Sequence, residues 1–398
     1  MRIAILTNDL HPSRGGPPRV VLGHALELRQ RGLFPEVLAS FGPGEEEATR
    51  AGWPELEEAN IPLHLFPRTG YGPLGRSPEL SAHFARHIAD FDVLHLHGTW
   101  EQCIASAARH AHRAKVPYVI SSHGMLDRYS RTQSRLKKWV AWNLFGTGRM
   151  LKQADGAMFG TQEEQDEASD LGLQYQPFII PNGIHLDDFS RTVGEGIEQL
   201  HASFPILAAK HPLLLFYSRM HPKKGVDLLL EGFARIQSEF PDARLLIAAL
   251  AQDPSYEARM RERANESDLR DQVVITTEYT GDRGRIPINA ADAFVLTSHQ
   301  EGFSMAILEA MAFELPVLIT HPCHMDEIGD AGAGEVVEAS ISGVEEGLRK
   351  LLRRTPDERT AMGQRGRHWV EDHCTWERVA EQLESMYEAL IRGKKASP

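Results

Sequence analysis

The feature that most constrains the fold is an alternation of short apolar runs with longer amphipathic stretches, repeated along almost the whole 398-residue chain. Runs of about four to eight residues separated by helical stretches are typical of βαβ units, which build parallel sheets. Helices are expected between most of the runs, for example at Arg19–Gln30 and Gln102–Arg113. In the first half, strands are expected at Arg2–Thr7, Glu36–Ser40, Leu63–Phe66, Asp92–His97, Tyr118–Ser121 and Gly156–Gly160.

The alternation stops and restarts near residue 182. Residues 177–188 read PFIIPNGIHLDD, an apolar run followed by a Pro-Asn-Gly turn, and such residues mark the end of an element. Beyond the turn, strands are expected at Leu213–Ser218, Arg244–Ala249, Val273–Thr276, Ala293–Thr297 and Pro316–Thr320. We therefore predict an α/β protein with two domains of mostly parallel sheets, 1–182 and 183–375. A C-terminal helix at 376–398 is expected to pack back toward the N-terminal domain.

Composition excludes several classes of protein. Cys103, Cys323 and Cys374 show no CxxC spacing, which argues against a disulfide framework and a structural zinc site. The net charge of −12 argues against general nucleic-acid binding. We expect no secretory signal, because the apolar stretch at the N-terminus is short, and no apolar run is long enough to span a membrane. We expect a cytoplasmic protein, peripheral at the inner face of the membrane if its basic segment binds lipid.

The strongest local signal for a binding site is SHQEGFSMAILEAMAFELPV, residues 298–317. A strand ends here, a Gly-containing turn follows and a helix begins, so free backbone N–H groups and the helix dipole should attract a phosphate. Glu301 lies in the turn, and Glu309 lies about two helical turns further on. Because carboxylates repel phosphates, we expect both to accept hydrogen bonds from sugar or ribose hydroxyls. The alternative is an ordinary solvated helix start.

A second signal is basic. In YSRMHPKKGVDLLLEGF, Arg219 ends an expected strand and Lys224 precedes a helix that begins at Gly225. Ligands of open α/β sheets bind at this carboxyl edge of the strands. A guanidinium together with an ammonium suits a diphosphate. The alternative is a basic surface loop.

Together these segments resemble the retaining GT-B glycosyltransferases of family 4. The match rests on Arg219, Lys224-Gly225 and Glu301-Gly302-Phe303 with Glu309. In the first half, Gly15-Gly16, HLHGTW, ISSHGMLD and PNGI match as well, so the resemblance covers nearly the whole chain. It implies two facing Rossmann-like domains with a cleft between them. The acceptor would lie on the N-terminal side and a nucleotide-sugar donor on the C-terminal side.

The resemblance also implies roles for the matching residues of the second half. Arg219 and Lys224 would neutralise the donor diphosphate as it leaves. Glu309 would hold the donor ribose, and Glu301 would bind hydroxyls of the transferred sugar. The backbone near the sugar and phosphate would be that of Gly302, Phe303 and Ser304.

In the first half, the resemblance places His123 beside the reacting centre, so that His123 and Glu301 form the catalytic pair. Gly15 and Gly16 would let the backbone approach the diphosphate. The family pattern has Gly where Ser218 and Glu314 stand here. Ser218 is small enough to be tolerated, whereas Glu314 is less expected, and neither change removes a charged group of the site.

The implied activity is transfer of a sugar from a nucleotide-diphosphate sugar to a saccharide or lipid-linked saccharide, with retention and without a metal or cofactor. Polysaccharide or glycolipid biosynthesis is the expected setting. Two alternatives stay open: a nucleotide-sugar epimerase of similar fold, and a non-catalytic regulator that binds sugar nucleotides. A nicotinamide oxidoreductase is disfavoured, because no G-x-G-x-x-G follows the first strand.

Residues 128–152 contain seven Lys and Arg residues, no acid, and the apolar bulk of Trp139, Trp142 and Phe145. A basic, Trp-bearing helix in an acidic protein predicts a surface for anionic lipid or a phosphorylated acceptor. The alternative is that the aromatic rings pack on the sheet and the cations are solvated. The DxD at 90–92 is read as a turn rather than a metal site. His95 and His97 are read as packed side chains, because no third ligand is evident.

Overall fold

The computed structural model describes residues 1–14, 16–70, 75–190, 195–208, 212–279 and 281–396. Its contacts divide the chain into unit 1, which comprises Met1–Gly183 and Trp376–Pro398, and unit 2, which comprises Ile184–Thr375. The sequence placed the division between residues 182 and 183, one residue earlier.

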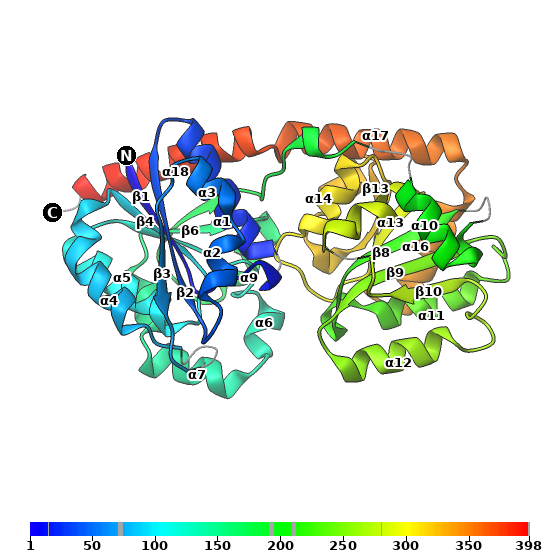
Figure 1. Cartoon of the computed structure of the whole chain (residues 1–398), viewed down its shortest axis with the longest axis horizontal. Coiled ribbons are helices and arrows are strands. Elements are labelled where there is room, and N and C mark those ends of the chain that lie inside the picture. The colour runs from blue at the N-terminus through cyan, green and yellow to red at the C-terminus, as the bar shows by residue number, and fades with distance from the viewer. Residues whose placement is uncertain (15, 71–74, 191–194, 209–211, 280, 397–398) are drawn as a thin grey trace. The chain divides into compact units, whose positions relative to one another are not determined.

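The described part of unit 1 is built on a sheet of seven parallel strands in the order β3-β2-β1-β4-β5-β6-β7 (Figure 1). The strands are β1 (Arg2–Thr7), β2 (Phe34–Phe41), β3 (Leu63–Pro67), β4 (Val93–His97), β5 (Tyr118–Ser121), β6 (Gly156–Phe159) and β7 (Gln176–Ile179). The helices are α1 (Gly16–Gln30), α2 (Glu46–Ala51), α3 (Pro54–Glu58), α4 (Pro78–His87), α5 (Gln102–Ala114), α6 (Arg128–Thr132), α7 (Arg135–Leu144), α8 (Thr147–Gln153), α9 (Gln162–Ser169) and α18 (Trp376–Ala396). Every strand predicted in this half is present.

Helices cover both faces of this sheet, as the alternation along β4 shows. Leu94 and Leu96 belong to a core that includes residues of α4 and α5. His95 points to the other face, where its Nδ1 lies 2.7 Å from the hydroxyl of Tyr387 on α18. Since successive side chains of a strand alternate between faces, α18 covers the face opposite to α4 and α5. The chain therefore returns to unit 1 after completing unit 2.

The apolar stripe of α18 explains this return. Val379, Leu383, Met386, Tyr387 and Leu390 recur at helical spacing and are buried. Glu384 pairs with Arg31, just beyond the end of α1, at 2.8 Å. The helix is thus held in unit 1 by both apolar and ionic contacts.

The described part of unit 2 contains a sheet of six parallel strands in the order β10-β9-β8-β11-β12-β13. They are β8 (Leu213–Met220), β9 (Arg244–Ala251), β10 (Val273–Thr276), β11 (Ala293–Leu296), β12 (Val317–Thr320) and β13 (Gly334–Val337). The helices are α10 (Glu195–Ser203), α11 (Val226–Ile236), α12 (Pro254–Ala264), α13 (Arg285–Ala290), α14 (Met305–Ala312), α15 (Glu327–Asp330), α16 (Ile341–Arg353) and α17 (Pro356–His373). The sequence analysis missed β13, a four-residue edge strand whose two central residues are only half-buried.

Both sheets have the same strand order, which is that of a doubly wound fold. The order reverses between β1 and β4 in unit 1 and between β8 and β11 in unit 2. Ligands of such sheets bind beyond the carboxyl ends of the strands at this switch point. The segments that follow β1, β4, β8 and β11 are therefore the expected places for a site. Most of the predicted residues lie at the ends of these strands or directly after them, whereas His123 follows β5.

The basic segment 128–152 differs from its prediction. It forms three short helices, α6, α7 and α8, rather than one, because Ser134 and Gly146 adopt left-handed backbone angles between them. Trp142 and the sheet core are in contact, but the side chain of Trp139 is 59% exposed. No helix within the described ranges is both long and apolar enough to cross a bilayer.

The departure at Glu314 has a conformational explanation. α14 ends at Ala312, and Glu314 follows with φ +58°. Glycine is favoured at such a position beyond a helix, since a side chain in the left-handed region costs about 1–2 kcal/mol. The glycine of the family pattern therefore suits the left-handed backbone angle at this position. Glu314 lies beyond the C-terminal end of α14, away from its first turn.

Candidate active site

The best-defined part of the candidate site is an ion pair at the switch point of unit 2. A single 3₁₀ turn, Pro222–Lys224, follows β8, and the loop Thr297–Ser304 follows β11. Lys224 Nζ lies 2.5 Å from Glu301 Oε1, and the two side chains are 8% and 10% exposed. Two charged groups predicted from separate motifs thus meet in a nearly dry environment.

Glu301 is held as a carboxylate. Burial raises the pKa of Glu301, but the nearby ammonium of Lys224 and the hydrogen bonds from Lys224 and Ser298 outweigh it, so the pKa lies below its usual range. Ser298 Oγ donates to the same Oε1 at 2.6 Å. An ionised, buried carboxylate accepts hydrogen bonds strongly, as contact with sugar hydroxyls requires.

Close backbone contacts bring the two loops together. His299 N donates to the carbonyl of Lys223 at 2.8 Å, and Thr297 Oγ1 donates to the carbonyl of Gly225 at 2.7 Å. Gly225 has φ +67°, and a Cβ there would stand 1.9 Å from the carbonyl oxygen of Thr297. Glycine at 225 is therefore a geometric requirement of the site.

The start of α14 provides the expected anion position. Ser304 is its N-cap residue, but the Ser304 side chain accepts no hydrogen bond from the first turn. The first N–H groups of a helix have no intrahelical acceptor, so those of α14 suit a phosphate. Gly302 and Phe303 lie half-buried between Glu301 and this helix, and Glu309 is half-buried in its second turn.

Arg219, the other cation predicted to bind a diphosphate, is not part of the Lys224–Glu301 ion pair. It lies near the end of β8, as expected, but its side chain is exposed and pairs with no carboxylate among the described residues. Burial lowers the pKa of the nearby His221 imidazole, and the positive charges of Arg219 and Lys223 lower it further. The structure thus pairs Lys224 with Glu301, whereas Arg219 is exposed near the end of β8.

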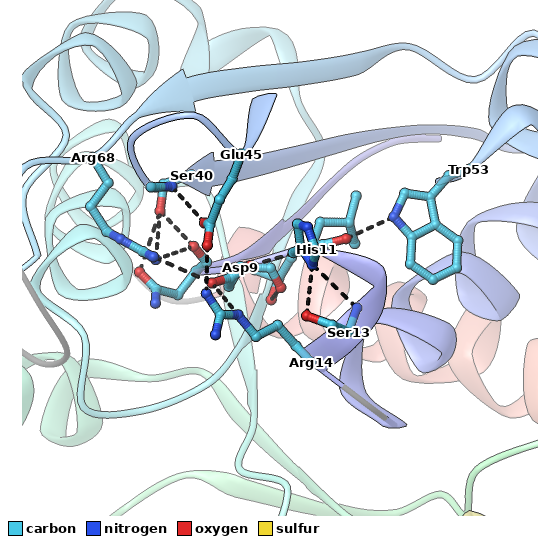
Figure 2. Close-up of polar contacts among 12 residues, drawn as sticks. Asp9, His11, Ser13, Arg14, Ser40, Glu45, Trp53 and Arg68 are labelled. Atoms are coloured by element: carbon cyan, nitrogen blue, oxygen red, sulfur yellow. Dashed lines mark hydrogen bonds and ion pairs between the residues drawn. The ribbon is translucent and has the colours of Figure 1, made fainter. Parts of the chain in front are cut away.

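In unit 1, the loop between β1 and α1 is pinned by charged side chains. Figure 2 shows Asp9 between Arg14 and Arg68, whose guanidinium nitrogens lie 2.9 and 3.3 Å from Asp9 Oδ2. Arg14 also pairs with Glu45 at 2.9 Å. Gly15 lies outside the described residues, and Gly16 is the first residue of α1. The loop thus leads into the helix start where the backbone was expected to approach a diphosphate.

His123 follows β5 and belongs to a group of imidazoles. Its Nε2 lies 2.9 Å from Nδ1 of His97, the last residue of β4. Burial lowers the pKa of His123 to about 4, so the ring is neutral at pH 7. A neutral imidazole can donate from one nitrogen and accept at the other, which fits contact with hydroxyls.

The structure adds a residue that the sequence did not single out, His24 on α1. Ligand atoms of His24, His95 and His97 all lie within 4.8 Å of one another. His95 already bonds through both nitrogens, to Tyr387 and Ser121. A cation would have to break one of those bonds, and the group contains no carboxylate to neutralise it. We therefore assign no metal chemistry to it.

The two acids of the DxD sequence have structural contacts. Asp92 Oδ2 accepts from the backbone N–H of Arg2 at 2.7 Å, and Asp90 Oδ2 lies 3.2 Å from His87. Asp92 thus contacts the first residue of β1, and Asp90 contacts the last residue of α4. This agrees with the interpretation of the segment as a turn.

Comparison with known proteins identifies the family. Residues 15–183 match the model of the glycosyl transferase 4-like domain, and residues 201–369 match that of the glycosyl transferases group 1. An alpha-monoglucosyldiacylglycerol synthase from Streptococcus pneumoniae is 22% identical over 80% of this chain and 70% of its own length. A GDP-mannose:cellobiosyl-diphosphopolyprenol alpha-mannosyltransferase from Xanthomonas oryzae is 25% identical over 85% and 83%.

Solved structures agree on the fold. Anabaena HepE, determined with UDP and glucose, superposes with a TM-score of 0.75 at 20% identity, over 98% of this chain and 99% of that one. The superposition therefore covers both units. The chain belongs to the group 1 glycosyl transferases and has the two Rossmann-like domains of the GT-B fold.

Proposed function

We propose that this glycosyltransferase moves a sugar from a nucleotide-diphosphate sugar to a saccharide or lipid-linked saccharide, with retention at the anomeric carbon. The observation that carries the proposal is the buried Lys224–Glu301 pair at the switch point of unit 2, beside the start of α14. It provides a cation for a phosphate and an anion for hydroxyls in one place.

The chemistry follows from the charges that develop. Breaking the bond between the anomeric carbon and the phosphate oxygen leaves oxocarbenium character on the sugar and negative charge on the diphosphate. Lys224, Arg219 and the first-turn N–H groups of α14 stabilise that charge without a metal. The acceptor hydroxyl attacks from the face that the phosphate leaves, and its proton passes to the departing phosphate. No protein nucleophile is required.

Other residues position the substrates. Glu301 accepts hydrogen bonds from the transferred sugar, and Glu309 holds the ribose of the donor. Gly302, Phe303 and Ser304 present backbone to the sugar and the phosphate. His123 contacts the sugar or the acceptor, and the backbone at Gly15 and Gly16 approaches the diphosphate.

The relatives support this choice of substrates. One relative is named for GDP-mannose and a diphosphopolyprenol acceptor, another for a glycosylated diacylglycerol, and HepE was solved with UDP and glucose. We infer that polysaccharide or glycolipid synthesis is the setting. Two other activities predict different products: an epimerase gives an epimer without an acceptor, and a regulator gives none. An anomeric proton spectrum of the product distinguishes all three and reports retention.

Donor binding is the first prediction to test. We expect one member of a panel of uridine and guanosine diphosphate sugars to raise the melting temperature, because a ligand at about 100 times its Kd adds about 2.7 kcal/mol of stability. Lys224→Ala should abolish the shift, whereas Arg270→Ala, on the exposed surface of unit 2, should keep it. A shift that survives in Lys224→Ala would place the donor elsewhere.

We also propose that unit 1 docks on anionic lipid through α7 and the pocket beside it. Leu136, Trp139 and Leu144 of α7 are 75%, 59% and 68% exposed. A pocket of about 490 Å³, which Leu144 helps to line, is also lined by Arg109, Arg149 and Lys152. Pairing of exposed apolar side chains with cations is the pattern of interfacial helices. Within the described residues these three cations pair with no carboxylate, so their charge is available to lipid phosphates.

Vesicle flotation tests the docking surface. We expect the protein to float with vesicles that contain phosphatidylglycerol and to stay behind with pure phosphatidylcholine. Trp139→Ser with Arg149→Glu should remove most binding, since each basic residue near an anionic surface contributes about 1 kcal/mol. Lys115→Glu, a charge change on the loop after α5, is the matched control. Equal flotation of both variants would refute the surface.

A further inference from the structure

The backbone that carries His123 is unusual. β5 ends at Ser121, and then His123 and Gly124 adopt φ values of +49° and +72°. A histidine in the left-handed region is disfavoured by about 1–2 kcal/mol and persists only where its surroundings hold it. The direction of the imidazole therefore depends on whatever fixes this turn.

The carboxylate of Glu164 on α9 fixes it. Glu164 Oε1 accepts from Ser122 Oγ at 2.6 Å and from Gly124 N at 2.5 Å, the two residues that flank His123. Its Oε2 accepts from Gly160 N, at the end of β6, at 2.8 Å. Glu164 is 1% exposed, and these donors are uncharged. A buried carboxylate that binds both sides of one residue holds that residue in place.

His97 fixes the ring itself. It ends β4, is 2% exposed, and pairs in register with Ser121 of β5. Its Nδ1 lies 2.9 Å from Nε2 of His123, and the two rings stack with centroids 5.1 Å apart. One imidazole nitrogen of His123 is therefore occupied, and Nδ1 remains for a ligand.

The surroundings of His97 decide which ring carries the shared proton. Within the described residues, Nε2 of His97 is buried without a hydrogen-bond partner. A buried N–H without an acceptor costs more than a buried lone pair without a donor. The favoured form of His97 thus has its proton on Nδ1 and donates to His123. Since a neutral imidazole has one N–H, His123 must carry its own proton on Nδ1.

We propose that Glu164 and His97 are positioning residues, which hold His123 so that its Nδ1–H is left as a hydrogen-bond donor for a substrate oxygen. The inference rests on the proposed function, because it takes His123 to contact the sugar or the acceptor. It adds Glu164, to which no motif of the chain pointed, and it gives a part in the site to His97, which the sequence analysis interpreted only as a packed side chain. Neither touches the substrate, and both act through the orientation of one ring.

Activity measurements test the positioning. Hydrolysis of the donor that gives the thermal shift is followed as nucleotide release, with water as the acceptor, so that no saccharide acceptor needs to be known. We expect His97→Leu to lower kcat by about 100-fold, with little change in KM. A loss of this size is typical when a group in the site is displaced by about 1 Å. His97→Asn, whose amide N–H replaces the Nδ1–H donor, should recover most of the loss. Equal losses in the two variants would overturn the role of His97.

Glu164 is tested beside a neighbour. Glu164→Ala should lower kcat in the same way, whereas Glu163→Ala, a half-buried glutamate of α9 with a carboxylate oxygen that accepts no hydrogen bond, should leave kcat and the melting temperature unchanged. A loss in Glu164→Ala that merely follows the folded fraction would make its role structural and overturn the proposal.

A spectrum that needs no activity separates this inference from the proposed function. In protein labelled with ¹⁵N-histidine, we expect His123, assigned with a His123→Asn variant, to carry its proton on Nδ1, and His97→Leu to shift that equilibrium. A proton on Nε2 of His123 would overturn the inference even in an active enzyme. If no sugar nucleotide is turned over, the proposed function fails. The position of the proton on His123 is measured independently of that outcome.

Discussion

Lys224→Ala and Glu301→Ala are each expected to lower the rate of sugar transfer by at least about 100-fold, which corresponds to about 3 kcal/mol of transition-state stabilisation. In the proposed mechanism, Lys224 supplies positive charge where the diphosphate gains negative charge, and Glu301 holds hydroxyls of the sugar. The ratio kcat/KM for the donor measures the effect. Near-normal turnover in either variant would show that the pair has no part in the chemistry.

The single variants are also expected to lose stability, and a double variant separates that loss from the loss of activity. Removal of Lys224 leaves the buried Glu301 carboxylate without its cation, and breaking a buried pair in this way costs about 3–5 kcal/mol. Lys224→Met combined with Glu301→Gln leaves no buried charge and is expected to melt close to the native protein while transfer stays at least about 100-fold down. Full activity in the folded double variant would contradict the assignment.

The Lys224–Glu301 pair could be predicted from sequence because each residue follows an apolar strand. Strand ends of a parallel sheet share one edge, so two such motifs converge once their strands are neighbours. The strand order, with β8 beside β11, supplies that adjacency. The same reasoning located most strands, since continuous apolar runs signal strands buried on both faces.

Residues that act through tertiary contacts gave no such signal. Glu164 lies in an acidic stretch, QEEQDEAS, where one buried carboxylate cannot be told from its exposed neighbours. His24 has a place in the imidazole group only because α1 packs across β4. The basic segment 128–152 was misjudged as one helix because left-handed residues such as Ser134 are not evident from composition. Each miss concerns a packing partner or a backbone angle, which periodicity does not report.

Gly225→Ala is expected to destabilise unit 2 by about 3 kcal/mol or more and to inactivate the enzyme. A left-handed alanine alone costs about 1–2 kcal/mol. The new Cβ would also stand 1.9 Å from the carbonyl oxygen of Thr297, a backbone atom at the end of β11 that cannot rotate away. Either α11 or the loop after β11 has to move. Chemical denaturation, with the transition of unit 2 followed separately, measures the cost.

A φ-matched glycine separates backbone strain from the clash. Gly172 has φ +60°, and a Cβ there would meet no atom within 4 Å, so Gly172→Ala should cost only the 1–2 kcal/mol of the left-handed region, about what strain alone predicts. Displacement of Thr297 in Gly225→Ala should also carry Ser298 away from Glu301, because the two residues are adjacent in the chain and Ser298 Oγ binds that carboxylate. Transfer should therefore fall further than the folded fraction does. If Gly225→Ala cost no more than Gly172→Ala, or if its activity simply followed the folded fraction, the contact between these two loops would not be what holds the Lys224–Glu301 pair together.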